Sequence, residues 1–241
     1  MGTLINVIAV LIGSTIGLVL GNRLPAKIQQ TVMNGLGLIT IAIGLQMALQ
    51  TQNMLIVMAS VLIGGILGEW WRIEDGLQSV GHWLEEKFGN KDAAQNGQSF
   101  TKAFVTTSLI YCVGPLSIVG SILDGLTGDY QPLAIKSMLD GFASMAFGAS
   151  LGPGVLFSTL TIFIYQGGMT LLAWLFGQNL GNITAQTPAV IELTATGGVL
   201  IMAIGLILLE LKPIRVANFL PATFIAPLIV VLLEYAGIGL G

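Results

Sequence analysis

The chain has 241 residues, of which 54% are hydrophobic and 9% are charged, and its mean hydropathy is +0.86. A soluble domain carries about 25% charged residues, so this composition excludes an ordinary water-soluble protein and predicts a membrane-embedded one. The net charge of −3 without a basic tract argues against nucleic acid as a partner, and a single cysteine, Cys112, excludes an intrachain disulfide or thiolate metal cluster.

Eight apolar segments are candidates for membrane helices, because a crossing helix needs roughly 20 mostly apolar residues. They cover 3–21, 28–49, 54–71, 100–123, 137–151, 154–177, 188–210 and 217–236. Gly152-Pro153-Gly154 lies where the fifth segment meets the sixth. Either two crossing helices meet there, or 137–151 enters the membrane as a re-entrant helix and 154–177 returns to the same side. The sequence predicts a single all-α, polytopic membrane domain over 1–241.

The orientation follows from the distribution of Lys and Arg, which gather in cytoplasmic loops. With eight helices, only Lys136 lies in a loop on one side of the membrane. The opposite side carries Arg23, Lys27, Arg72, Lys87, Lys91, Lys102, Lys212 and Arg215. Both termini are therefore expected outside the cytoplasm.

Residues 73–98 are too polar to cross a membrane and are expected on the cytoplasmic side. Apolar residues recur at helical spacing from Ile73 to Phe88, with acidic side chains mostly on the opposite face. Helices that lie on lipid are usually basic, whereas this one is acidic. We expect an amphipathic helix that caps the protein's own loops or offers a surface to a partner.

Two halves of the chain resemble each other, with Ile41–Leu45 matching Met202–Leu206 and further identities in the same order. Helices 1–3 correspond to helices 6–8, and helix 4 corresponds to helix 5 through Gly114-Pro115 and Gly152-Pro153. Corresponding helices run in opposite directions, so the repeats are predicted to be inverted. Inverted repeats are typical of secondary transporters, and they also occur in channels and in proteins that do not transport.

The two Gly-Pro sites are predicted helix breaks, because proline removes a backbone donor and the freed carbonyls need new partners. Polar side chains share a face beside each break: Ser117, Ser121 and Asp124 after the first, and Ser137, Asp140 and Ser144 before the second. The alternative is a simple proline kink with hydroxyls bonded to their own helix, and with Asp124 and Lys136 at the outer interface.

A second polar cluster begins with Glu192 and continues through Thr194 and Thr196 to Gly198, one turn inside a helix that starts at Pro188. Glu192 could bind a coupling ion such as H⁺ or Na⁺, or extend to the outer headgroups; the sequence leaves both open. The predicted substrate- or ion-binding residues are Asp140, Ser144, Ser117, Ser121, Gln166, Glu192, Thr194 and Thr196.

Enzyme motifs do not support catalysis. Gly148–Gly152 fits G-x-S-x-G but lies in an apolar helix, and the single histidine, His82, belongs to the polar segment. We expect no enzyme activity, resident metal or cofactor beyond a coupling ion. Glycines spaced by four, such as Gly13, Gly17 and Gly21, are expected to serve close helix packing, within the protomer or in a homo-oligomer.

Five motifs occur along the chain: Cys112–Pro115, Gly120–Leu126, Lys136–Phe142, Tyr165–Gly167 and Glu192–Gly198. Together they resemble those of the YqgA/YdfK-like bacterial membrane proteins, a family of unknown function. The resemblance covers essentially the whole chain and implies a bacterial inner-membrane protein, without assigning roles to residues.

The residues favour a secondary transporter or permeation pathway for a small polar solute or ion, coupled to H⁺ or Na⁺. The alternative is a non-transporting scaffold or regulator in the bilayer that acts through 73–98. A polar cavity at the breaks would favour transport, and a dry, packed interior would favour the scaffold.

Overall fold

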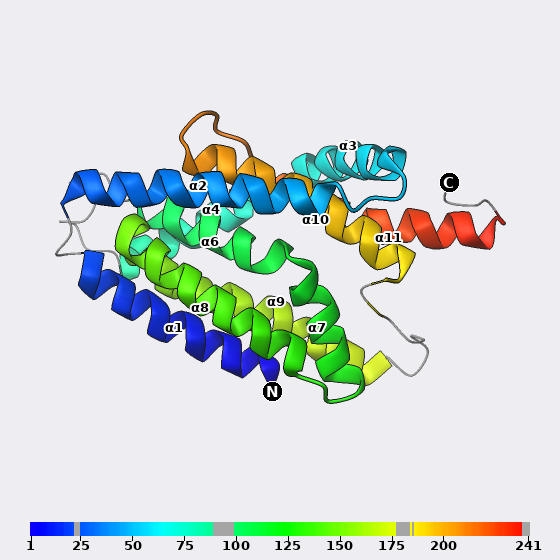
Figure 1. Ribbon diagram of the computed structural model, residues 1–241, viewed down its shortest axis with the longest axis horizontal. Helices are drawn as coiled ribbons and strands as arrows, with labels where there is room; N and C mark the ends of the chain where they lie inside the picture. The colour runs from blue at the N-terminus through cyan, green and yellow to red at the C-terminus, as the bar shows by residue number, and fades with distance from the viewer. Residues whose placement is uncertain (22–24, 89–98, 177–183, 185, 238–241) are drawn as a thin grey trace. The chain divides into compact units, whose positions relative to one another are not determined.

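The computed structural model describes residues 1–21, 25–88, 99–176, 184 and 186–237, and within these ranges it contains helices and no strands. The α-helices are α1 (Gly2–Gly21), α2 (Ala26–Ala48), α3 (Met54–Trp71), α4 (Ile73–Phe88), α6 (Phe100–Val113), α7 (Pro115–Leu126), α8 (Gln131–Leu151), α9 (Gly154–Phe176), α10 (Pro188–Leu208) and α11 (Leu220–Tyr235) (Figure 1). A short 3-10 helix, η2 (Val216–Phe219), precedes α11.

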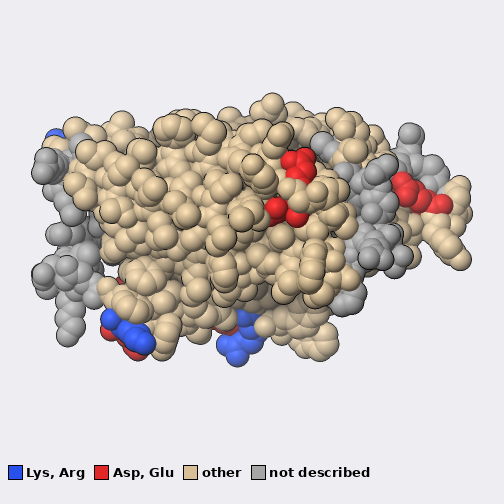
Figure 2. Space-filling view, turned by 90° about the horizontal axis from the view of Figure 1, so that it is seen from below, with Lys and Arg blue, Asp and Glu red and all other residues tan. Residues whose placement is uncertain are grey.

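The expectation of an all-α, polytopic membrane protein is confirmed. In the described residues, six helices are long and apolar enough to cross a bilayer, and α6 with α7 forms a seventh candidate bent by 60°. Large apolar side chains such as Ile8, Ile12 and Val19 of α1 are about half exposed, as lipid-facing residues are. Charged side chains form only small, separate patches on the face in Figure 2.

The chain divides into two compact units. Unit 1 comprises 1–36, 77–112 and 116–181, and unit 2 comprises 37–76, 113–115 and 182–241. The chain passes from one unit to the other within α2 and α4. The predicted inverted repeat relates helices of both units, so it stays a prediction.

Unit 1 is built on the close packing of α1 against α8, which lie side by side in Figure 1. Gly13, Gly17 and Gly21 bring α1 against the α8 backbone, where a Cβ on any of them would collide with a carbonyl oxygen of Gly141, Met145 or Ala149. These glycines therefore pack within the protomer, as small residues do between membrane helices.

Helix α4 (Ile73–Phe88) covers the first part of the polar segment 73–98, and residues 89–98 lie outside the described residues. In unit 1, Leu84 is buried, and Gly81 faces Thr101 and Phe104 of α6. The Thr101 hydroxyl donates a hydrogen bond of 2.6 Å to Glu85. This half of α4 therefore packs over the start of α6.

The two predicted breaks interrupt helices in different ways. Helix α6 ends at Val113 and α7 begins at Pro115, with the 60° bend between them. At the second break, α8 and α9 are separate helices joined through Gly152, whose φ of 90° favours glycine.

The predicted boundary at 137 is wrong. Helix α8 begins at Gln131, so Lys136 lies inside the helix rather than in a loop at the outer interface. Pro132 in the first turn explains the early start, because proline fits the beginning of a helix. The hydropathy-based prediction began the helix after Lys136 because this residue is charged. In the structure, however, the Lys136 side chain is buried.

Unit 2 packs α10 against the second half of α2 and against α3 and α11. Gly44 of α2 lies against Gly198 and Met202, and Gly205 of α10 lies against Gly37 and Ile41. The sequence comparison aligns Gly44 with Gly205, so these two contacts are reciprocal. Reciprocal contacts are the local pattern expected at a two-fold axis.

In unit 2, a cluster of charged and polar side chains around η2 binds the end of α3 and the start of α4. Arg215 pairs with Glu69 and Asp75, and Asn218 donates to Glu69 over 2.5 Å. The Arg72 hydrogen bond and the nearby Arg215 charge hold the pKa of the exposed Asp75 carboxyl below its usual range. These contacts fix the start of α4 against η2.

Candidate functional site: a buried polar network

Unit 1 contains an ion pair buried between helices. Lys136 and Asp140 lie one turn apart on α8, and the Lys136 ammonium bonds the Asp140 carboxylate. The two residues are only 5% and 9% exposed. A charge that far from water is costly unless it is paired, so each residue requires the other.

Amide side chains from two other helices complete the network. The Asn6 amide of α1 donates to Asp140 over 3.0 Å and to the Gln166 carbonyl oxygen of α9 over 3.2 Å. Asn6 and Gln166 are both fully buried. Four polar side chains from α1, α8 and α9 therefore meet in the interior of unit 1.

The network continues to the first helix break. The Gln166 amide reaches the Ser117 hydroxyl of α7 at 3.5 Å, and that hydroxyl donates to the Tyr111 carbonyl of α6 over 2.6 Å. The bond from Ser117 to Tyr111 crosses Gly114-Pro115, so it supplies a partner to a carbonyl freed where the helix is interrupted.

Two polar atoms around the network have no hydrogen-bond partner in the described residues. They are the side-chain oxygen Oδ1 of Asn6 and the Tyr111 hydroxyl. The Tyr111 ring also lies 5.9 Å from the Lys136 ammonium. Buried polar atoms without partners cost free energy, so these two atoms favour a bound water or a polar ligand.

Ser121 and Ser144, the other predicted serines, bond to carbonyls of their own helices, the alternative that the sequence left open. Ser121 donates to the carbonyl of Ser117 one turn earlier, and Ser144 donates to Gly141 within α8. Ser144 also lies 3.3 Å from the Val10 carbonyl of α1. These hydroxyls satisfy helix carbonyls, and Ser144 adds a link between α1 and α8.

In unit 2, Glu192 is 1% exposed and binds the start of α3. Its carboxylate accepts hydrogen bonds from the Thr51 hydroxyl and the Gln52 backbone N–H, both at 2.7 Å, and from the Asn53 backbone N–H at 3.2 Å. Glu192 therefore ties α10 to the segment before α3.

The rest of the second cluster lies along α10. Thr194 donates to the Val190 carbonyl of its own helix, whereas the buried Thr196 hydroxyl has no partner in the described residues. A Cβ on Gly197 would lie 2.9 Å from the Val113 carbonyl at the first break. Gly197 thus lets α10 approach the interrupted backbone.

The structure brings Asp140, Gln166 and Ser117 into one network and gives Ser121 and Ser144 places on the surrounding helices. Glu192, Thr194 and Thr196 all lie on α10 in unit 2. Sequence reasoning missed Asn6 and, as a site residue, Lys136. Asn6 had a signal, because it is the one side-chain amide in a largely apolar first helix, where such residues commonly bond to neighbouring helices.

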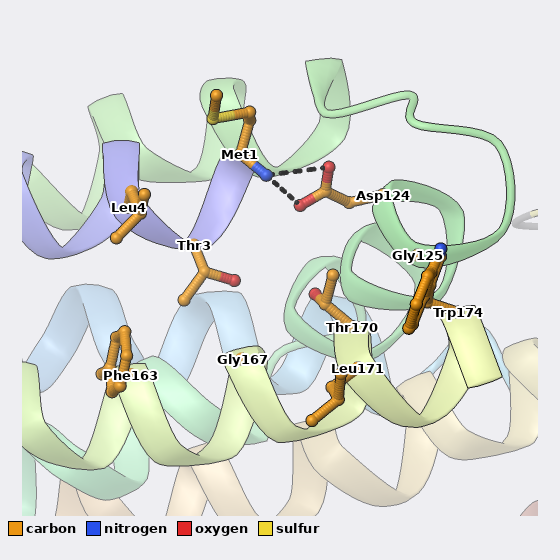
Figure 3. A pocket seen from close by; sticks show the side chains of 10 residues that line it. All are labelled: Met1, Thr3, Leu4, Asp124, Gly125, Phe163, Gly167, Thr170, Leu171 and Trp174. Carbon is orange, nitrogen blue, oxygen red and sulfur yellow. Dashed lines mark hydrogen bonds and ion pairs between the residues drawn. The ribbon is translucent and has the colours of Figure 1, made fainter.

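A pocket of about 260 Å³ lies on the same helices of unit 1. It is lined by Met1, Thr3, Leu4, Asp124, Gly125, Phe163, Gly167, Thr170, Leu171 and Trp174 (Figure 3). Within the described residues, no three His, Cys, Asp or Glu side chains come together as ligands for one metal ion.

Comparison with known proteins gives a family without an assigned activity. The family model "Protein of unknown function (DUF554)" matches residues 1–231. The chain is 30% identical over 226 residues to "Uncharacterized protein YqgA" of Escherichia coli (strain K12), covering 94% of each chain. It is 28% identical over 241 residues to "Uncharacterized membrane protein YdfK" of Bacillus subtilis (strain 168), covering 98% of each. No solved structure matches. The chain belongs to the DUF554 family, and the resemblance read from its motifs is confirmed.

Proposed function

We propose that the protein is a secondary transporter or permeation pathway for a small polar solute or ion. The observation that carries the proposal is the buried network of Lys136, Asp140, Asn6 and Gln166. Ionisable residues inside membrane helices are costly, and they commonly line the paths of solutes and protons.

Stability alone is a poor reason to keep such an ion pair. Apolar side chains of similar size in place of a buried pair often leave a protein equally stable or make it more so. The pair does offer a function that apolar residues lack, because Asp140 can exchange Lys136 for a proton, a cation or a solute donor. The unpartnered Asn6 oxygen and Tyr111 hydroxyl add two groups that a polar solute could bond.

Coupling to H⁺ or Na⁺ is part of the proposal. Asp140 is the first candidate, since protonation or cation binding would release Lys136. Glu192 is the second, because losing its charge would weaken its hold on the segment before α3. Either event changes contacts between helices, which is how a coupling ion can influence access to a site.

A scaffold role is the second candidate, supported by exposed apolar side chains of α4. Val80 and Trp83 are 43% and 55% exposed on this polar helix. Such side chains could contact a partner protein or the membrane surface. Loss of a partner complex on replacing Trp83, with no solute flux by the wild-type protein, would favour this role.

The proposed setting is the bacterial inner membrane with both termini outside the cytoplasm. With Lys136 inside α8, no Lys or Arg remains in the loops predicted outside, which strengthens the charge bias. In a Cys112→Ser background, Asp129→Cys should react with an impermeant maleimide in intact cells, and His82→Cys should react only after lysis. The reverse pattern would contradict this orientation.

Flux into proteoliposomes tests the proposed function. Purified protein would be reconstituted with a pH-sensitive dye inside, under an inward H⁺ or Na⁺ gradient. The external solution would contain amino acids, short amines, short carboxylates and polyols, with uptake read by mass spectrometry. The wild type should accumulate at least one solute above protein-free liposomes, or conduct the ion itself.

The variants separate the sites from the rest of the protein. Asp140→Asn and Glu192→Gln should each lower the flux by about tenfold or more, as expected when a charged hydrogen-bonding group is lost. Glu86→Gln, on the exposed face of α4, should transport like the wild type. No flux under either gradient, or normal flux in both carboxylate variants, would refute the proposal.

A further inference from the structure

The pocket of unit 1 has one carboxylate, at its α7 side. Asp124 is 8% exposed and accepts a hydrogen bond of 3.0 Å from the Gly2 amide. The Met1 ammonium lies 3.0 and 3.2 Å from the two carboxylate oxygens (Figure 3). This end of the pocket therefore accommodates an ammonium nitrogen with N–H donors.

Two hydroxyls in the pocket have no partner in the described residues. Thr3 is 6% exposed, and the hydroxyl oxygens of Thr3 and Thr170 are both buried and unbonded. Figure 3 shows the two oxygens turned toward each other across the pocket. Unbonded, buried hydroxyls facing a cavity point to a ligand or waters that would bond them.

The remaining walls are mostly apolar. Phe163, Leu171 and Trp174 come from α9, and Leu4 comes from α1. Apolar walls favour a ligand with a hydrocarbon part, and aromatic rings attract cations when these lie over the ring face. The lining thus suits a ligand with a positive head and a short apolar chain.

The pocket lies on the same helix faces as the buried network. Thr3 and Asn6 are three residues apart on α1, and Gln166 and Thr170 are four apart on α9, spacings that place each pair on one face. The network also holds an ammonium group, that of Lys136, on the Asp140 carboxylate. Asp124 of α7 and Asp140 of α8, the two buried carboxylates among the described residues of unit 1, thus each bind a primary ammonium.

We propose that this pocket binds a small primary ammonium ion with a short apolar chain, and that such amines are the solutes of the transport function proposed above, on which this inference rests. The ligand's ammonium bonds Asp124 in place of the Met1 ammonium, whose residue has a side chain 83% exposed. The Thr3 and Thr170 hydroxyls take the remaining N–H donors.

Calorimetric titration of the full-length protein in nanodiscs tests the site without measuring flux. The probe is n-butylammonium, compared with tetramethylammonium, which has no N–H donor, and with butyrate, which has the opposite charge. Butylammonium should bind at least about tenfold tighter than either. Equal binding of butylammonium and tetramethylammonium would refute the proposal.

Two variants locate the binding. Asp124→Asn should weaken butylammonium binding by about tenfold or more, as expected for a charged hydrogen bond. Thr3→Val removes an unbonded hydroxyl, so it should leave the fold at least as stable while weakening binding several-fold. Glu86→Gln should bind like the wild type. Unchanged affinity in a folded Asp124→Asn protein or in Thr3→Val would overturn the assignment.

The outcome is separable from that of the transport experiment. Tight butylammonium binding by a protein without flux would refute the proposed function and leave the binding site standing. Flux of another solute without butylammonium binding would refute only the site.

Discussion

Replacing Lys136 by methionine should destabilise the protein by about 3–5 kcal/mol, the usual cost of removing one partner of a buried ion pair. Methionine keeps much of the side-chain length and removes the charge, so Asp140 would remain buried with the Asn6 amide as its bonded neighbour. For a chain of this size, that loss corresponds to a fall of roughly 6–20 °C in the unfolding temperature.

The single cysteine supplies the measurement. Cys112 is 4% exposed, so a thiol-reactive fluorescent dye labels it only as the protein unfolds on heating. Lys212→Met, at an exposed position, is the matched control and should stay within about 0.5 kcal/mol of the wild type. A Lys136→Met protein as stable as this control would show that the ion pair does not form.

The second large effect is expected at the contact between α1 and α8. In Gly17→Ala, the added methyl group would collide with the Met145 carbonyl oxygen. A backbone carbonyl within a helix cannot rotate aside, so the two helices must separate. Overpacking of this kind costs about 1–3 kcal/mol and sometimes more. The Cys112 labelling assay should therefore give a lower unfolding temperature than that of the wild type.

Gly168→Ala is the matched control for this substitution. It adds the same methyl group to α9, where nothing lies within 4 Å of the new atom. Alanine is the better helix former, so this variant should unfold at the same or a higher temperature, by up to about 1 kcal/mol. Equal unfolding temperatures for the two alanine variants would show that Gly17 does not lie against the α8 backbone.

Much of the fold could be predicted from hydropathy, because long apolar helices carry a strong signal. Segments 54–71 and 3–21 correspond closely to α3 and α1. Local chemistry also marked the interruptions, since Gly114-Pro115 removes a donor where α6 ends. Helix α8 was predicted too short because hydropathy cannot recognise a lysine whose charge is neutralised by a partner one turn away.

The site was predictable only in part, for a similar reason. Asp140 and Gln166 stood out as polar residues in apolar segments, and they do meet in the network. Their link through Asn6 joins positions 134 and 160 residues away in sequence, which no local pattern reveals. Glu192 was recognised, but its partners at 51–53 depend on how α10 packs beside α3.

The most direct test of transport through the network is flux by the charge-free variant Lys136→Met/Asp140→Leu. Removing both charges should restore most of the stability lost in Lys136→Met, because no charge is left buried and unpaired. With a Cys112 unfolding temperature close to that of the wild type, this variant should show no flux above protein-free liposomes. Wild-type flux by the same folded variant would contradict a role for the Lys136–Asp140 pair in transport.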